Sequence, residues 1–214
     1  MPLWPLLLAL IGLTIVSLIY LAARPSATRG PGGKAFAFLL IFLAPALAIF
    51  GGATAHFERS KTTAFCLSCH AMEPYGKSLL VDDKEFVPAQ HFQNNRIPRD
   101  HACYTCHTDY ALFGGVRSKI RGLRHMFVNY FGSVPDTIKL YTPYKNRECL
   151  HCHLGMRSFE ESSGHKDEET PLADIKSGKV SCMEAGCHDV AHNVHELEDA
   201  QFWKPLPTAQ EKGE

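Results

Sequence analysis

The chain has 214 residues, with 22 basic and 22 acidic side chains and a formal net charge of zero. A balanced charge excludes a broad electrostatic attraction to nucleic acid. Apolar residues are concentrated in the first quarter of the chain, whereas cysteine and histidine are concentrated in the remainder, so the two portions are suited to different solvents.

Two uncharged stretches, residues 2–23 and 35–57, open the chain. Each is long enough, at about 1.5 Å per residue, to cross the roughly 30 Å hydrocarbon layer of a bilayer as a helix. The segment between them, Arg24 to Lys34, is rich in Pro and Gly and carries three basic residues and no acidic one. These features predict a transmembrane helical hairpin over residues 1–58.

A cleaved signal peptide and a buried apolar hairpin are the two other interpretations of this region. A signal peptide begins with basic residues, but Met1-Pro-Leu-Trp-Pro has none. The length of both stretches and the basic loop favour two retained spans. Under the positive-inside rule the loop faces the cytoplasm and the chain after His56 faces the opposite side, which at a bacterial inner membrane is the periplasm.

The eight cysteines form four pairs, and a histidine follows each pair directly: Cys66-Leu-Ser-Cys69-His70, Cys103-Tyr-Thr-Cys106-His107, Cys149-Leu-His-Cys152-His153 and Cys182-Met-Glu-Ala-Gly-Cys187-His188. Two thiols about one helical turn apart can form thioethers with the two haem vinyl groups, while the adjacent imidazole reaches the iron. We therefore predict four covalently bound haem c groups, numbered 1 to 4 in chain order. The fourth motif has a wider spacing, which a loop containing Gly186 can close.

Zinc ribbons and redox dithiols also use Cys-x-x-Cys, but neither requires a histidine directly after the second cysteine. Structural disulfides would leave those histidines unexplained. Residues 59–203 therefore predict a small multihaem cytochrome c domain, mostly α with sparse secondary structure. So short a chain needs the macrocycles for much of its apolar interior, and without them it should be largely unfolded. The polar tail, residues 204–214, is predicted to be disordered.

Eight histidines lie outside the positions that follow the cysteine pairs: His56, His91, His101, His125, His151, His165, His192 and His195. A lone histidine is usually an ordinary polar residue. His151 lies inside a haem motif and His56 at the membrane boundary, so we interpret both as bystanders. The roles of His101 and His195 stay open.

The first motif, Cys66-Leu-Ser-Cys69-His70-Ala-Met72-Glu-Pro74, resembles that of the NapC/NirT/NrfH family of membrane-anchored tetrahaem quinol dehydrogenases, where Cys-x-x-Cys-His-x-Met-x-Pro recurs. The similarity covers residues 60–196. It continues with His91-Phe-Gln-Asn-Asn-Arg, the stretch from Lys119-Ile-Arg to Gly132, His165, and the ending Cys187-His188-Asp-Val-Ala-His192.

This resemblance implies that His91, His165 and His192 are distal iron ligands of bis-histidine haems. It also implies that haem 1 is different. Met72 is its expected iron ligand, with His70 as the competing ligand, and the quinone is expected to lie nearby. The pairing of the distal histidines with individual haems is not readable from one sequence. The family usually has one anchoring helix, whereas this chain offers two.

Residues 116–131 place apolar side chains on one helical face, namely Val116, Ile120, Leu123, Phe127 and Phe131, and arginines on another, namely Arg117, Arg121 and Arg124. This pattern predicts an interfacial amphipathic helix, and docking on lipid alone would produce the same pattern. Lys119 matches the lysine that the resemblance places at the quinol pocket. His125 stands where the family usually has an acidic residue, and it is a candidate proton acceptor, a candidate ligand of the haem 1 iron, or a plain interfacial histidine.

The resemblance implies electron transfer between the quinone pool and a periplasmic partner, as part of a complex at the lipid membrane. The expected partner is a multihaem nitrite reductase or another periplasmic reductase, and the expected activity is that of a quinol dehydrogenase. Three alternatives stay open. They are reverse flow from a hydroxylamine-oxidising multihaem enzyme to quinone, a terminal reductase at an open haem 1, and a structural anchor for a soluble cytochrome.

Overall fold

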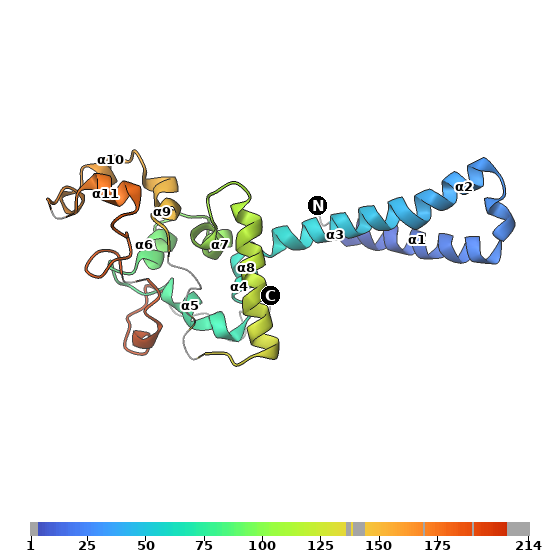
Figure 1. The fold of residues 1–214 in the computed structure, drawn as a ribbon. Coiled ribbons are helices and arrows are strands. Elements are labelled where there is room, and N and C mark those ends of the chain that lie inside the picture. The colour runs from blue at the N-terminus through green and yellow to red at the C-terminus, as the bar shows by residue number, and fades with distance from the viewer. Residues whose placement is uncertain (1–3, 136–137, 139–143, 169, 190, 205–214) are drawn as a thin grey trace. The chain divides into compact units, whose positions relative to one another are not determined.

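The computed structural model describes residues 4–135, 138, 144–168, 170–189 and 191–204 (Figure 1). The chain divides into two units, residues 1–61 and 62–214. The predicted domain boundary after residue 58 lies in the last turn of helix α3, which ends at Arg59. Apart from Lys204, the predicted disordered tail lies outside the described residues.

The first unit is a helical hairpin. Helix α1 spans Trp4–Ala23, and the chain turns through the 3-10 helix η1, Pro25–Thr28. It returns through α2 (Pro31–Phe38), the π-helical turn η2 (Leu39–Leu43) and α3 (Ala44–Arg59). The widened turn ends two residues before Pro45, which has no N–H to donate to the helical ladder. Two runs, Pro5–Ala23 and Pro31–Arg59, are long and apolar enough to span a membrane.

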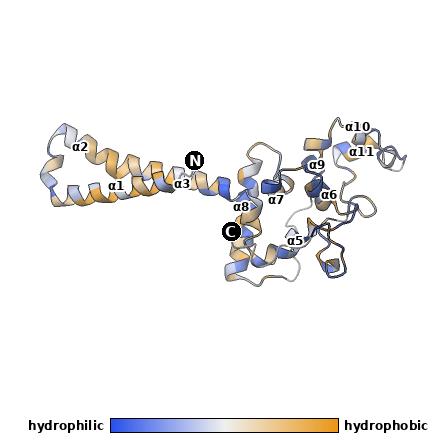
Figure 2. Ribbon diagram, turned by 180° about the vertical axis from the view of Figure 1, so that it is seen from behind, coloured by the Kyte–Doolittle hydropathy of each residue, from blue (hydrophilic) through white to orange (hydrophobic). Residues whose placement is uncertain are grey.

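The interior of the hairpin contains small polar side chains together with Leu21 and Leu40, and most of its large apolar side chains lie outside. A Cβ atom on Gly33 would lie 1.8 Å from the carbonyl oxygen of Ala27, so only glycine fits in this turn. Thr14 and Ser17 are buried on α1, which suits close contact between helices. Ile49 and Phe50 are 73% and 74% exposed, and Figure 2 shows hydrophobic residues along both arms of the hairpin. Such an apolar exterior is what a lipid environment requires.

The second unit consists of short helical segments joined by irregular chain. Its α-helices are α4 (Thr63–Cys66), α5 (Glu73–Ser78), α6 (Val87–Gln93), α7 (Ala102–His107), α8 (Gly114–Phe131), α9 (Asn146–His153), α10 (Arg157–Glu160) and α11 (Leu172–Ser177). Its 3-10 helices are η3 (His70–Met72), η4 (Arg99–His101), η5 (Ser163–His165) and η6 (Val194–Glu196). Within the described ranges there is no β-strand, only an isolated bridge between Val81 and Phe202. The predicted fold class, mostly α with sparse secondary structure behind apolar helices, is confirmed.

The apolar core of this unit is small. Its central cluster contains Val81, Phe86, Ala89 and Leu197. The C-terminal segment closes over this cluster, because Asp82 N–H donates to the carbonyl of Gln201 at 2.8 Å and Trp203 N–H donates to that of Leu80 at 2.8 Å. This closure brings the C-terminal part of the chain back to the segment that follows α5.

Candidate haem sites

The four cysteine motifs lie on short, separate elements. The first runs from the end of α4 into η3, the second lies in α7 and the third in α9. The fourth lies in turns, with Gly186 at a φ of 83°, a left-handed conformation that favours glycine. No two of the eight cysteines form a disulfide. Short helices hold the second and third pairs in register, and the turn between α4 and η3 holds the first, as attachment of a porphyrin edge requires.

The motifs neighbour one another in chain order. The thiols of Cys66 and Cys103 share a hydrogen bond, which lowers the pKa of Cys66 to about 7 and raises that of Cys103. A second hydrogen bond joins Cys149 and Cys182 and lowers the pKa of Cys182 to about 7. Burial, and then the charge of the nearby Cys152, raise the pKa of Cys106. Motif 1 therefore lies beside motif 2, motif 2 beside motif 3, and motif 3 beside motif 4.

Two buried polar side chains hold these motif pairs together. Thr63, three residues before Cys66, donates to the carbonyl of Arg99 at 2.8 Å and accepts from Ala102 N–H at 2.8 Å. Asn146, three residues before Cys149, donates to two carbonyls, those of Ile175 at 2.8 Å and Val180 at 2.7 Å. The side-chain oxygen of Asn146, Oδ1, accepts from Cys182 N–H at 2.9 Å. Each of these two side chains thus acts as a clamp, which joins the start of one motif to the segment that begins the next.

The three predicted distal histidines each face a motif histidine. The ring centroids are 6.1 Å apart for His192 and His107, 5.8 Å for His91 and His153, and 6.1 Å for His165 and His188. An iron–imidazole bond of about 2 Å on each side, plus roughly 1 Å from each nitrogen to its ring centre, gives about 6 Å. The three separations therefore fit an iron ion held between each pair, in haems 2, 3 and 4 respectively.

The hydrogen bonds of the distal histidines His91 and His165 leave the ring nitrogen Nε2 available to bind a metal. His91 Nδ1 lies 2.7 Å from the carbonyl oxygen of Val87, and His165 Nδ1 lies 2.8 Å from that of Phe159. A carbonyl only accepts, so Nδ1 carries the proton in both rings and Nε2 keeps its lone pair for a metal. His192 Nδ1 lies 2.6 Å from Ser78 Oγ instead.

The charge state of the histidine pairs also suits ligation. Burial, and then the neighbouring His107, lower the pKa of His192 to about 4. Desolvation likewise lowers the pKa of His107 and of His153. These rings are neutral at neutral pH, which is the form that binds a metal.

The first motif has a different environment. His70 is exposed and Met72 is half-buried, and in the described part of the chain no histidine ring faces His70. Lys119 contributes to the lowered pKa of Cys66, and its Nζ lies 4.8 Å from the centre of the Tyr104 ring. Lys119 is thus close to the first motif. The charge of His125 adds to the desolvation that lowers the pKa of His107, which indicates that His125 lies near motif 2.

The remaining histidines with described contacts have ordinary partners. The His151 ring stacks on Tyr110, with centroids 3.8 Å apart and planes 11° apart. This pair lines a cavity of about 720 Å³ beside motif 3. His101 lies 3.0 Å from the carboxylate of Asp100. These contacts suit packing and surface roles.

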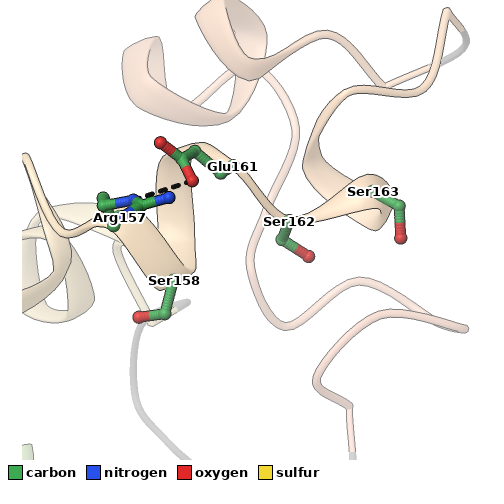
Figure 3. Close-up of a pocket in the computed structure, with 5 residues that line it drawn as sticks. All are labelled: Arg157, Ser158, Glu161, Ser162 and Ser163. Carbon is green, nitrogen blue, oxygen red and sulfur yellow. Dashed lines mark hydrogen bonds and ion pairs between the residues drawn. The ribbon is translucent and has the colours of Figure 1, made fainter.

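A second cavity, of about 560 Å³, is lined by Arg157, Ser158, Glu161, Ser162 and Ser163 (Figure 3). Arg157 Nε and Glu161 Oε2 lie 2.9 Å apart and neutralise each other there. The lining contains no cysteine or histidine, so this cavity offers no haem ligand.

Several residues that shape the sites escaped the sequence-based reasoning. Thr63, Asn146 and Ser78 are buried polar residues that each have a hydrogen-bond partner 29 to 114 positions away along the chain. Thr63 and Asn146 share a position three residues before a motif, which is a weak pattern that could have been noticed. Ser78 follows no pattern, because only the folded chain brings it to His192.

Cysteine pairs followed directly by histidine are the haem-attachment pattern of c-type cytochromes. The sequence pattern described as the NapC/NirT cytochrome c family, N-terminal region, matches residues 33–197. The chain belongs to this family, and the resemblance seen in the motifs is thereby confirmed. It is accordingly a membrane-bound cytochrome with c-type haem and an anchor of apolar helices.

Individual relatives are distant. The cytochrome c-type protein NapC of Escherichia coli (strain K12) is 22% identical over an alignment of 183 residues, which covers 76% of this chain and 84% of the relative. The cytochrome c-type protein TorC of the same strain is 22% identical over an alignment of 174 residues, which covers 72% of this chain and 42% of the relative. No solved structure matches the chain. The family match begins at residue 33, so it includes α3 but not α1.

Proposed function

We propose that this cytochrome binds four haem c groups and carries electrons between the quinone pool and a periplasmic redox partner. The observation that carries the proposal is the set of three facing histidine pairs at 5.8 to 6.1 Å. When bound, haem supplies reversible one-electron chemistry. The motif cysteines would attach the four groups, and neighbouring motifs would place them in a row.

We propose that the histidine pairs His107–His192, His153–His91 and His188–His165 hold haems 2, 3 and 4. Haem 1 would be ligated by Met72 or His70. His125 is a candidate ligand on the other side of haem 1. Its charge, however, adds to the desolvation that lowers the pKa of His107, which favours a position of His125 nearer to motif 2.

Helix α8 supports a quinol site at the membrane surface. It has no acidic residue, and Val116, Ile120, Leu123, Phe127 and Phe131 are 49% to 80% exposed. Such a face can enter the acyl boundary of a bilayer while the arginines of the helix meet lipid phosphates. Lys119 is half-buried beside the Tyr104 ring and near Cys66, where it can donate a hydrogen bond to a quinol oxygen. His125 is the candidate acceptor of a quinol proton.

The test is the rate at which a quinol analogue reduces the haems of the purified full chain. We expect Lys119→Ala to slow this reduction roughly tenfold to hundredfold, because one charge-assisted hydrogen bond is lost. Lys84→Ala is the matched control, since Lys84 is an exposed lysine outside α8, and it should leave the rate unchanged.

Two outcomes contradict parts of the proposal. An unchanged rate in Lys119→Ala would remove Lys119 from the quinol pocket. If the unmodified chain is reduced by dithionite but never by the quinol analogue, the quinol dehydrogenase function is wrong and a structural anchor is favoured.

The order of the motifs supports a meeting place for the partner. Motif 4 is the last in the row, so the partner should meet the chain there. A periplasmic multihaem reductase of the nitrite reductase type is the partner we propose, in a complex at the inner membrane with the haem domain in the periplasm. A terminal reductase at haem 1 is the second candidate, because in the described chain no histidine ring faces His70. Four low-spin haems would exclude it.

A further inference from the structure

Ser78 is fully buried, with 0% of its surface exposed, and it lies at the end of α5. Its hydroxyl oxygen is 2.7 Å from the carbonyl of Tyr75 and 2.6 Å from His192 Nδ1. A serine hydroxyl has one proton, and the Tyr75 carbonyl can only accept it. Ser78 therefore donates to Tyr75 and accepts from the Nδ1–H of His192, which leaves the lone pair of Nε2 available for a metal.

The two ring planes at this site are nearly parallel. The planes of His107 and His192 differ by 16°, whereas those of His91 and His153 differ by 84° and those of His165 and His188 by 70°. The edge of Tyr75 confines the His192 ring, with centroids 5.4 Å apart. Tyr75 is itself fixed by two hydrogen bonds to the backbone of Ile138, of 3.1 Å and 2.9 Å.

The acceptor at His192 differs in kind from those at the other two distal histidines. His91 and His165 donate to backbone carbonyls four and six residues earlier, so local chain geometry orients their rings. His192 donates to a side chain 114 residues away. Only at this site does a single substitution remove the acceptor.

We propose that Ser78 is a positioning residue that holds the His192 ring nearly parallel to that of His107, so that haem 2 differs from haems 3 and 4. This inference rests on the proposed ligation of haem 2 by those two histidines. In general coordination chemistry, near-parallel axial imidazoles give low-spin ferric haem a rhombic electron paramagnetic resonance spectrum. Near-perpendicular imidazoles give a strongly anisotropic spectrum with a large maximum g value. Hydrogen bonding at Nδ1 also makes the imidazole a better donor to ferric iron and lowers the reduction potential.

The experiment compares spectra and potentials of the purified, fully haem-loaded chain. The unmodified protein should show one rhombic and two strongly anisotropic bis-histidine signals. Ser78→Ala should move the rhombic signal to a larger maximum g value and raise the potential of that haem, with the other two signals unchanged. Ser177→Ala is the matched control, because its exposed hydroxyl makes the same type of bond, to the carbonyl of Asp174 at 3.0 Å. It should change nothing.

An unmodified chain without a rhombic bis-histidine signal would overturn the inference, and this measurement needs no variant. A Ser78→Ala spectrum and potential identical to those of the unmodified chain would also overturn it. His192→Ala tests the ligation of haem 2 by His192 separately from the positioning role of Ser78. It should convert the rhombic low-spin signal into a high-spin one. If it leaves every low-spin signal intact, the ligation of haem 2 is wrong, whatever Ser78 does.

Discussion

Thr63 and Asn146 are single residues on which the spacing of two motif pairs depends. Asn146 is 6% exposed and satisfies three backbone groups, so removing its amide leaves all three without their partner. An unsatisfied buried polar group costs about 1–3 kcal/mol. The position of Cys182 relative to Cys149 therefore depends strongly on this one side chain.

We expect Asn146→Ala to destabilise the protein by about 2–4 kcal/mol and to lower the attachment of haem 4. Haem stoichiometry by mass spectrometry and the midpoint of denaturant unfolding measure the two effects. Asn94→Ala is the matched control, because Asn94 is exposed and bonds only within its own helical turn, to Gln90. Full haem loading and an unchanged midpoint in Asn146→Ala would show that the clamp is dispensable.

For single residues, the sequence predicts which side chains bind haem better than it predicts which of them pair with each other. The Cys…Cys-His motifs and the candidate ligands His91, His165 and His192 can be read from local patterns and family resemblance. The assignment of His192 to His107 cannot, because 85 residues separate the two rings and only closure of the C-terminal segment joins them. Ser78 is unpredictable for the same reason.

Among the helices of the second unit, α8 is the one that the sequence predicts most clearly and that serves the proposed quinol site most directly. Residues 116–131 were expected to form an amphipathic helix, and the helix runs from Gly114 to Phe131. Its start is fixed by Asp109 N–H, which donates to Ser118 Oγ at 2.9 Å. The two extra residues escape the pattern because contact with the chain after motif 2 determines where the helix begins.

Two glycines of α8 should respond in opposite ways to alanine. A Cβ atom on Gly114 would lie 1.7 Å from the carbonyl oxygen of Asp109, whereas on Gly122 it would meet nothing within 4 Å. We expect Gly114→Ala to destabilise the protein by about 1–3 kcal/mol and to slow quinol oxidation, because the helix start must shift. Gly122→Ala should stabilise it by about 0.5–1 kcal/mol. Thermal unfolding of the haem-loaded chain measures both, and equal midpoints would contradict the assigned helix start.

On the scale of the whole molecule, the first unit is a hairpin with an apolar exterior and the second has little apolar core of its own. The central cluster, Val81, Phe86, Ala89 and Leu197, is small for a unit that runs from residue 62 to 214. Covalent haem can supply the missing interior. The hairpin could be predicted from hydropathy alone. The arrangement of the motifs could not, because most of the second unit is irregular chain and short helical segments, which have no periodic sequence pattern.

Near-infrared magnetic circular dichroism of the oxidised, full-length protein is the most direct test of the haem arrangement, because it separates bis-histidine from histidine–methionine ligation. The three facing ring pairs predict bis-histidine intensity equivalent to three haems per chain, with haem 1 contributing separately. Bis-histidine intensity for fewer than three haems in a fully loaded chain would contradict the assigned ligand pairs, and with them the proposed electron-transfer path.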